Sequence, residues 1–267
     1  MTRGRIALTG LVIVAVLALS ALIADVLPLG SPTEIAKDQA LQGPTVAEPF
    51  GMDDLGRSVL SRVVHAYRVS LGVAVAGAFL ALLIGGPLGL VAGYAEGLPD
   101  QLIMRPLDVL MAFPAILLAI ALMSVFGTGA LLVAIALAVV YTPIVARVVR
   151  AAVLATKVEV YVDGARALGA SVPRLLLAHI VPNAATPVLV QASVLMAIGI
   201  LIEAALSFLG VGVRPPTPSL GLMLADGRGF MLQAPWMVIF PGLAIMLAVL
   251  GFNMIADGLR DWMDPTR

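Results

Sequence analysis

Cysteine is absent from this chain, and charged residues are scarce. Only 12% of the 267 residues are Asp, Glu, Lys or Arg, whereas about a quarter is usual for a soluble protein. So few charges cannot cover a water-facing surface, which indicates an outer surface in contact with lipid. The lack of cysteine excludes disulfide bonds and thiolate metal sites. The formal net charge of zero gives no sign of a nucleic-acid partner, and the two histidines, His65 and His179, lie too far apart in the sequence to predict a metal site.

Long uncharged stretches are what the sequence has instead. Hydrophobic residues make up 61% of the chain, and a helix needs about 20 apolar residues to cross a bilayer. Uncharged runs cover residues 6–24, 69–95, 109–146, 180–202 and 229–256. The third run is long enough for two spans, and Gly127-Thr128-Gly129 inside it is typical of a tight turn. The runs predict an all-α, polytopic membrane protein with six transmembrane helices, at residues 6–26, 69–94, 105–126, 130–149, 184–208 and 236–256.

The first run has two interpretations. Arg3 and Arg5 precede it, and Ala18-Leu19-Ser20 is a small-x-small triplet, so it could be a cleaved signal peptide. The apolar stretch continues past that triplet and exceeds the usual signal core of about 7–15 residues, which favours a retained helix. We therefore expect an N-terminal helix with an outer segment over residues 1–68, and a five-helix core over residues 69–267.

Lysine and arginine predict the orientation of the spans, because cytoplasmic segments carry an excess of them. With the N-terminus inside, ten basic residues lie in inner segments and six in outer segments, so both termini are expected in the cytoplasm. The inner set is Arg3, Arg5, Arg105, Arg147, Arg150, Lys157, Arg166, Arg174, Arg260 and Arg267, and the outer set is Lys37, Arg57, Arg62, Arg68, Arg214 and Arg228.

The loop at residues 150–183, expected in the cytoplasm, has a clear helical pattern. A stripe with i, i+3, i+4, i+7 spacing predicts a short helix; its members are Val158, Tyr161, Val162 and Ala165. Gly169 can supply the left-handed backbone that ends this helix. Ser171 can cap a second helix with Pro173 in its first turn, and we expect Pro182 to end the unit before the next span.

Two stretches of this loop resemble the EAA loop of ABC importer permeases. They read Tyr161-Val162-Asp163-Gly164-Ala165-Arg166-Ala167-Leu168-Gly169-Ala170-Ser171 and His179-Ile180-Val181-Pro182-Asn183. Asp163, Gly164 and Ala165 stand at the Glu-Ala-Ala positions; Asp keeps the charge, and Gly164 weakens the helix by about 1 kcal/mol relative to alanine. The resemblance implies that the loop couples to an ATPase through Tyr161, Asp163, Gly164, Ala165, Arg166, Leu168 and Gly169.

Other segments are similar to dipeptide and oligopeptide permeases of the same family. They lie at residues 51–62, 105–114, 203–219 and 234–261, with Met52 where Thr is expected and Leu220 where Trp is usual. On these residues the chain is identified as a member of that family, the C-type permease subunit. The resemblance implies a heterodimer with a homologous permease, two cytoplasmic ATPase subunits or domains, an extracytoplasmic binding protein and a bacterial inner-membrane location. It implies a peptide cargo, and leaves nickel and glutathione open.

Glu203 is an ionisable residue in an otherwise apolar span. Such residues usually face a protein interior or a water-filled path. One interpretation places Glu203, together with Ser207 one turn away, beside the translocation pathway and near a peptide amine. The other interpretation is a structural hydrogen bond between helices. We expect no catalytic residue and no metal site.

The energy for transport is expected to come from another polypeptide. The only two lysines, Lys37 and Lys157, do not lie in a phosphate-binding loop, so ATP and Mg would be bound by the partner ATPase and this chain would need no cofactor. An ion-gradient-driven secondary transporter is the alternative, although it would favour several buried carboxylates. A membrane enzyme would need paired carboxylates, a metal cluster or a nucleophile triad, and the spans contain none. The favoured interpretation is a non-enzymatic permease subunit for di- or oligopeptides.

Overall fold

The computed structural model describes residues 3–262, and within that range the chain is helical and has no β-strand. The α-helices are α1 (Arg3–Leu22), α2 (Val59–Ala95), α3 (Gly97–Met111), α4 (Ala115–Phe126), α5 (Ala130–Thr156), α6 (Val160–Ala167), α7 (Val172–Leu175), α8 (Val181–Phe208), α9 (Leu220–Gly227) and α10 (Trp236–Trp262). Two 3₁₀ turns cover Lys37–Gln39 and Arg228–Phe230, and a π-helical turn over Leu176–Ile180 joins α7 to α8.

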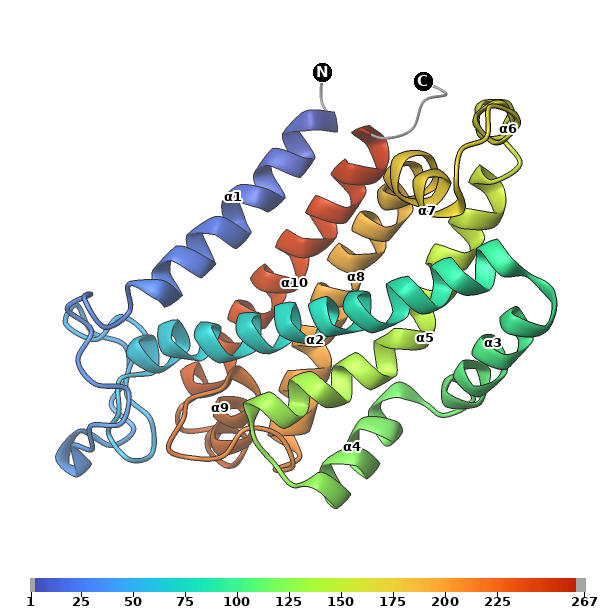
Figure 1. Ribbon diagram of the computed structural model, residues 1–267. Helices are drawn as coiled ribbons and strands as arrows, with labels where there is room; N and C mark the ends of the chain where they lie inside the picture. Colours follow the sequence, from blue (N-terminus) through green and yellow to red (C-terminus); the bar gives the residue numbers. More distant parts are fainter. Residues whose placement is uncertain (1–2, 263–267) are drawn as a thin grey trace.

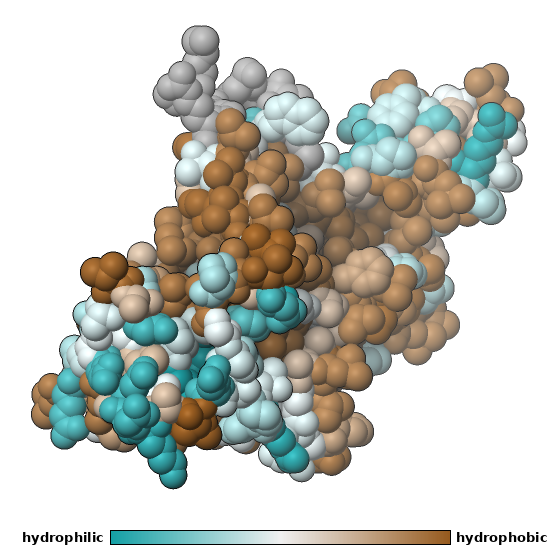
Figure 2. Space-filling model, turned by 90° about the vertical axis from the view of Figure 1, so that its left-hand side faces the viewer, coloured by the Kyte–Doolittle hydropathy of each residue, from teal (hydrophilic) through white to brown (hydrophobic). Residues whose placement is uncertain are grey.

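Four helices are long and apolar enough to cross a membrane: α2, α5, α10 and the continuous Val172–Phe208 helix that contains α7 and α8. A fifth crossing is formed if α3 and α4 count as one broken span. The predicted number of six is reached when the shorter apolar stretch of α1, Ile6–Leu22, is added. Figure 2 shows hydrophobic residues over the middle of the molecule and hydrophilic residues gathered toward its two ends, as a membrane protein requires.

Helix α2 lies at the centre of the bundle and packs on α5 through glycines. An added Cβ at Gly89 would lie 2.3 Å from the carbonyl oxygen of Ala146, and one at Gly85 would lie 2.7 Å from that of Thr142. The absence of a side chain at these positions is therefore what lets the two backbones approach, as is common between helices in membranes. Residues of α2 and α8 contribute to both hydrophobic clusters of the core, one shared with α1 and α10 and the other with α4 and α5.

Helix α2 begins ten residues before the span predicted at 69–94, so the boundary expected between residues 68 and 69 falls inside a helix. Its first turn is capped by the side chain of Ser58. Arg68, which bounds the uncharged run, and Arg62 before it are part of the helix because both have partners. Arg62 is 3% exposed and pairs with Asp53, while Arg68 donates to the carbonyls at the end of α1.

The single helix predicted at 105–126 is wrong. The structure has two helices, α3 and α4, bent by 91° at a break between Met111 and Ala115. Pro114 explains the break, because proline lacks an N–H and disfavours helical backbone at the preceding residue. The predicted turn between spans is confirmed: α4 ends at Phe126, α5 begins at Ala130, and φ is +97° at Gly127 and +140° at Gly129.

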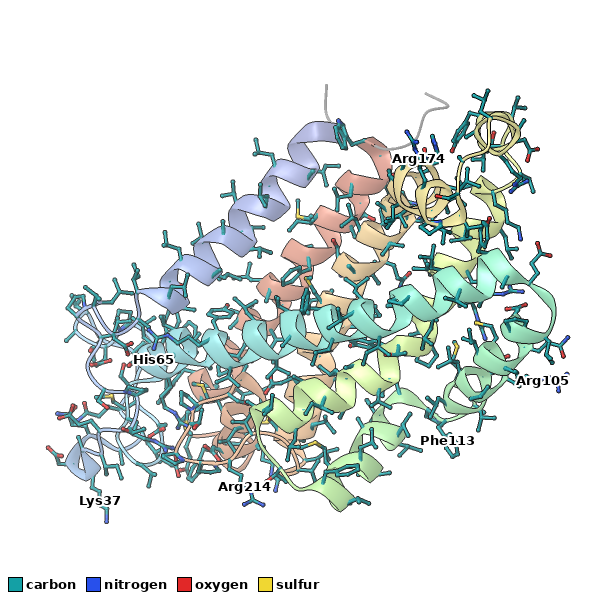
Figure 3. All side chains as sticks on the ribbon, in the orientation of Figure 1. Lys37, His65, Arg105, Phe113, Arg174 and Arg214 are labelled. Carbon is teal, nitrogen blue, oxygen red and sulfur yellow. The ribbon has the colours of Figure 1, made fainter. Side chains whose placement is uncertain are left out.

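Helix α1 begins and α10 ends at the same end of the bundle as α6 and α7 (Figure 1). Figure 3 places Arg174 at this end, and Lys37 and Arg214 at the opposite end. This separation agrees with the division of basic residues on which the predicted orientation depends.

Candidate functional site

The short helix predicted in the 150–183 loop is present as α6. Only Val162 of its eight residues is buried, and it anchors the helix to the rest of the chain. Tyr161, next to it, is exposed, and its ring lies 6.4 Å from the ring of His179 in the π-helical turn. The helix therefore lies on the surface, held by one apolar side chain and by the two ends of the loop.

Gly169 ends this helix as predicted. Its φ is +83°, and the N–H of Ala170 donates to the carbonyl of Ala165 at 3.1 Å, which closes the turn after the helix. This is the left-handed C-terminal arrangement that glycine adopts without the steric cost of a Cβ. A Cβ at Gly169 would meet no atom within 4 Å, so the backbone angle and not a packing contact favours glycine here.

The second helix of the loop differs from the prediction at both ends. Ser171 occupies the cap position and Pro173 lies in the first turn, but the Ser171 side chain makes no capping hydrogen bond. Pro182 does not end the unit, because the helix continues through it into α8. A proline ring clashes with the carbonyl four residues earlier in a regular helix, and the π-helical turn Leu176–Ile180 widens the helix at that point. The loop is consequently joined to α8 without a break.

The base of the loop is tied to the end of α2. Lys157 donates to the carbonyl of Gly93 at 2.9 Å and also pairs with Glu96. Beside this contact is a hollow of about 450 Å³, lined by Tyr94, Glu96, Lys157, Val158, Asp163 and Arg166. Four of these six residues are charged at neutral pH, so the hollow is suited to polar groups of another protein rather than to lipid.

Asp163 forms an ion pair with Arg166, with 2.7 Å between its Oδ1 and the guanidinium nitrogen. Both side chains are at least half exposed, so the pair contributes little to stability. Each group remains accessible to a partner of opposite charge.

The seven residues predicted to couple to an ATPase lie together on α6 and the turn after it; six are exposed and Ala165 is half-buried. Leu168, the most apolar of them, is 91% exposed. The structure adds Val160 and Leu177, which are also largely exposed and were not singled out in the sequence. Their signal was present, since large apolar side chains outside the spans need a partner surface.

Glu203 does not lie on a surface. Its carboxyl is fully buried, and it accepts hydrogen bonds from the hydroxyl of Ser70 on α2 at 2.7 Å and from that of Ser207 at 2.8 Å. Ser207 is equally buried. Neither side chain reaches the surface of this chain. The geometry corresponds to the other interpretation, a hydrogen bond between helices. Within residues 3–262, no group of three or more Asp, Glu or His side chains could hold a metal ion.

Comparison with known proteins identifies the family. Residues 85–267 match the family described as binding-protein-dependent transport system inner membrane component. The chain is 43% identical over 263 residues to the dipeptide transport system permease protein DppC of Alkalihalophilus pseudofirmus, which covers 98% of this chain and 86% of the relative. It is 40% identical over 256 residues to the glutathione transport system permease protein GsiD of Pectobacterium atrosepticum, covering 96% and 85%.

The fold is similar to that of an amino acid ABC transporter of known crystal structure, with a TM-score of 0.61 at 15% identity, over 76% of this chain and 95% of that one. At this identity the likeness concerns the fold alone. The family match, the relatives and the shared fold together show that this chain belongs to the binding-protein-dependent transport system inner membrane components, the permeases of ABC importers.

Proposed function

We propose that this chain is one of two permease subunits of an ATP-driven importer of di- or oligopeptides. The observation that carries the proposal is the exposed helix α6, fixed between α5 and the continuous helix that contains α8. A surface helix attached at both ends to membrane spans can convert movement of a docked protein into movement of those spans.

Helix α6 is proposed to be the docking element for a cytoplasmic ATPase. Its exposed apolar residues, Val160 and Leu168, would be buried in a groove of the ATPase, and Asp163 would pair with a basic group there. Burial of such side chains is favourable by about 25 cal/mol per Å² of apolar surface. Because α6 leads through Gly169 directly into the helix of α8, displacement of the docked helix would move that span.

The remaining partners complete the transporter. A homologous permease would supply the other half of the translocation pathway, and two ATPase subunits or domains would bind ATP and Mg. An extracytoplasmic binding protein would deliver the peptide to the end of the bundle opposite α6. The chain would lie among lipids of the bacterial inner membrane with both termini in the cytoplasm, in agreement with the shared end of α1, α6 and α10 (Figure 1).

Peptides are the proposed cargo because the relatives are named as permeases for dipeptides, di- and tripeptides, and glutathione. Nickel, which the sequence left open, has no support in these names. An ion-gradient-driven carrier, the other function considered, is at odds with membership of a binding-protein-dependent family.

Reconstitution would test this function. The two permeases, the ATPases and the cognate binding protein would be assembled in liposomes, and uptake of a labelled dipeptide, a tripeptide and glutathione would be compared. We expect uptake that requires both ATP and the binding protein, with a preference among the three peptides. Uptake that follows an ion gradient without ATP, or uptake of none of the peptides, would contradict the proposal.

A further inference from the structure

The buried carboxyl of Glu203 links α2, α8 and the loop that follows α8 through hydrogen bonds. Ser70 donates to it from α2 and Ser207 from the same helix, and the buried hydroxyl of Ser219 lies beside it. All four side chains are 0% exposed. We call Glu203, Ser70, Ser207 and Ser219 the Glu203 network.

Two members of the network hold the loop at residues 209–219, on the side of the molecule opposite α6. The hydroxyl of Ser207 accepts a hydrogen bond from the backbone N–H of Val213 at 3.1 Å. Ser219 ends the loop and caps α9, accepting from the N–H of Leu222 at 3.3 Å. The middle of the loop is therefore attached to the carboxyl through Ser207, and its end at Ser219 lies beside the carboxyl.

Glycines bring this loop and the first turn of α9 close to α8. A Cβ at Gly212 would lie 2.5 Å from the Ser207 hydroxyl, and one at Gly221 would lie 2.0 Å from the carbonyl of Ala204. The carbonyl of Gly212 also accepts from the N–H of Gly129, in the turn between α4 and α5. The loop is closely packed at these points, so a displacement of the loop would also displace α8 and the α4–α5 turn.

The other end of the same helix enters the coupling loop. Residues 172–208 form one continuous helix of 37 residues, about 55 Å long at 1.5 Å per residue. The Glu203 network lies near its outer end, and α6 precedes its inner end. A rigid helix of this length transmits a shift or rotation from one end to the other.

A buried network of this kind has few intermediate states. The hydroxyls of Ser70 and Ser207 donate to a fully buried carboxyl, so a small displacement of the loop that Ser207 holds would leave a buried polar group without a partner, which is strongly unfavourable. The loop and the helix are therefore expected to move together.

We propose that Glu203 is a positioning residue that ties the outer loop at 209–219 to α8, so that contact of the binding protein with this loop is transmitted along the helix to α6 and stimulates the ATPase. This inference rests on the proposed function for its partners. Its structural half, the tie between carboxyl and loop, can be tested without them.

The first test measures the tie. The chain has no cysteine, so Arg214→Cys, at an exposed position in the loop, can carry a single spin label. Glu203→Gln keeps the side-chain shape but replaces one accepting oxygen by a donor, and Ser219→Ala removes the contact at the end of the loop. We expect the label to become more mobile in both variants. Ser193→Ala is the matched control, since Ser193 lies on the same helix and bonds only the carbonyl of Leu189; its label should match wild type.

The second test measures transmission. In reconstituted transporters, the ratio of binding-protein-stimulated to basal ATP hydrolysis should fall about fivefold or more in Glu203→Gln and Ser219→Ala, the lower range of allosteric coupling between sites. The Ser193→Ala control should keep the wild-type ratio.

The outcomes separate the two proposals. Unchanged label mobility in Glu203→Gln overturns the tie, and a mobile loop with an unchanged hydrolysis ratio overturns transmission. If the wild-type assembly shows no stimulation by the binding protein, the proposed function fails, and the spin-label measurement still decides whether Glu203 holds the loop.

Discussion

At the scale of single residues, Gly169 and Gly164 make a matched pair on the coupling loop. Both have open space where a Cβ would lie, but only Gly169 has a positive φ. We expect Gly169→Val to strain the turn by about 1–3 kcal/mol and to weaken ATPase docking while the permease stays in the membrane. Gly164→Ala should instead stabilise α6 by about 1 kcal/mol and retain docking. Co-purification of the ATPase with each variant measures the difference, and equal recovery with both would refute the assigned role of the turn.

Asp163 supplies a second prediction at this scale. Asp163→Lys places a positive charge next to Arg166 and opposite the basic group expected in the ATPase. Because both side chains are exposed, protein stability should not change. Stimulated hydrolysis and peptide uptake should fall together, whereas Asp163→Asn should retain more of both. Wild-type uptake by the lysine variant would remove Asp163 from the docking surface.

We expect the removal of a hydroxyl to affect stability differently at two buried tyrosines. Tyr67 donates to the carbonyl of Ala244 at 3.0 Å, so Tyr67→Phe should lower the free energy of unfolding by about 1 kcal/mol. The hydroxyl of Tyr141 has no hydrogen-bond partner within residues 3–262, so Tyr141→Phe should leave stability unchanged or raise it. Thermal unfolding of the detergent-solubilised permease compares the two. A loss of stability in Tyr141→Phe would reveal a bound water or a partner from another subunit.

At the scale of helices, the contact between α2 and α5 depends on which face of α2 carries glycine. Gly89→Ala would place a methyl group 2.3 Å from the backbone oxygen of Ala146, and we expect a loss of about 1–3 kcal/mol from overpacking. Gly86, which directly follows Gly85 in α2, has open space where its Cβ would lie. Gly86→Ala should therefore be neutral or slightly stabilising. The midpoint of thermal unfolding would be measured for both variants. Similar midpoints would mean that α2 and α5 accommodate the added methyl group without losing stability, which would contradict the prediction.

The break between α3 and α4 is a feature that charge and hydropathy along the sequence did not predict. The residues from Val109 to Phe126 carry no charge and predict one straight span. Pro114 interrupts it, and the two helices take directions 91° apart. Asp100 and Asp108 of α3 pair with Arg150 and Arg147 of α5, which holds α3 against the inner half of that helix.

At the scale of the whole molecule, the orientation is a prediction that the lack of cysteine makes straightforward to test. Leu168, Lys37 and Arg214 are exposed. Lys37 and Arg214 lie at one end of the bundle (Figure 3), and Leu168 directly follows α6 at the other end (Figure 1). An impermeant thiol reagent added to intact cells should label Lys37→Cys and Arg214→Cys and leave Leu168→Cys unlabelled until the cells are opened. Labelling of Leu168→Cys from outside would reverse the topology and with it the assignment of α6 to the cytoplasm.

The sequence alone determined the class of fold, most of the spans and the short helix of the loop at residues 150–183. These features follow from short-range physics. An uncharged run of sufficient length must be helical in lipid because every backbone hydrogen bond has to be made within the segment, and Gly169 ends α6 because of its own φ. The family motif in the loop is likewise a property of consecutive residues.

Only the tertiary structure decided where charges are tolerated and which polar groups meet. Arg62 lies inside α2 because Asp53 and Asp226 neutralise it, and Asp226 is 164 residues away in the sequence. Glu203 accepts a hydrogen bond from Ser70, which is 133 residues away in the sequence. The cost of a buried charge depends on its partners in space, and no periodicity or spacing along one chain reveals partners that only packing brings together.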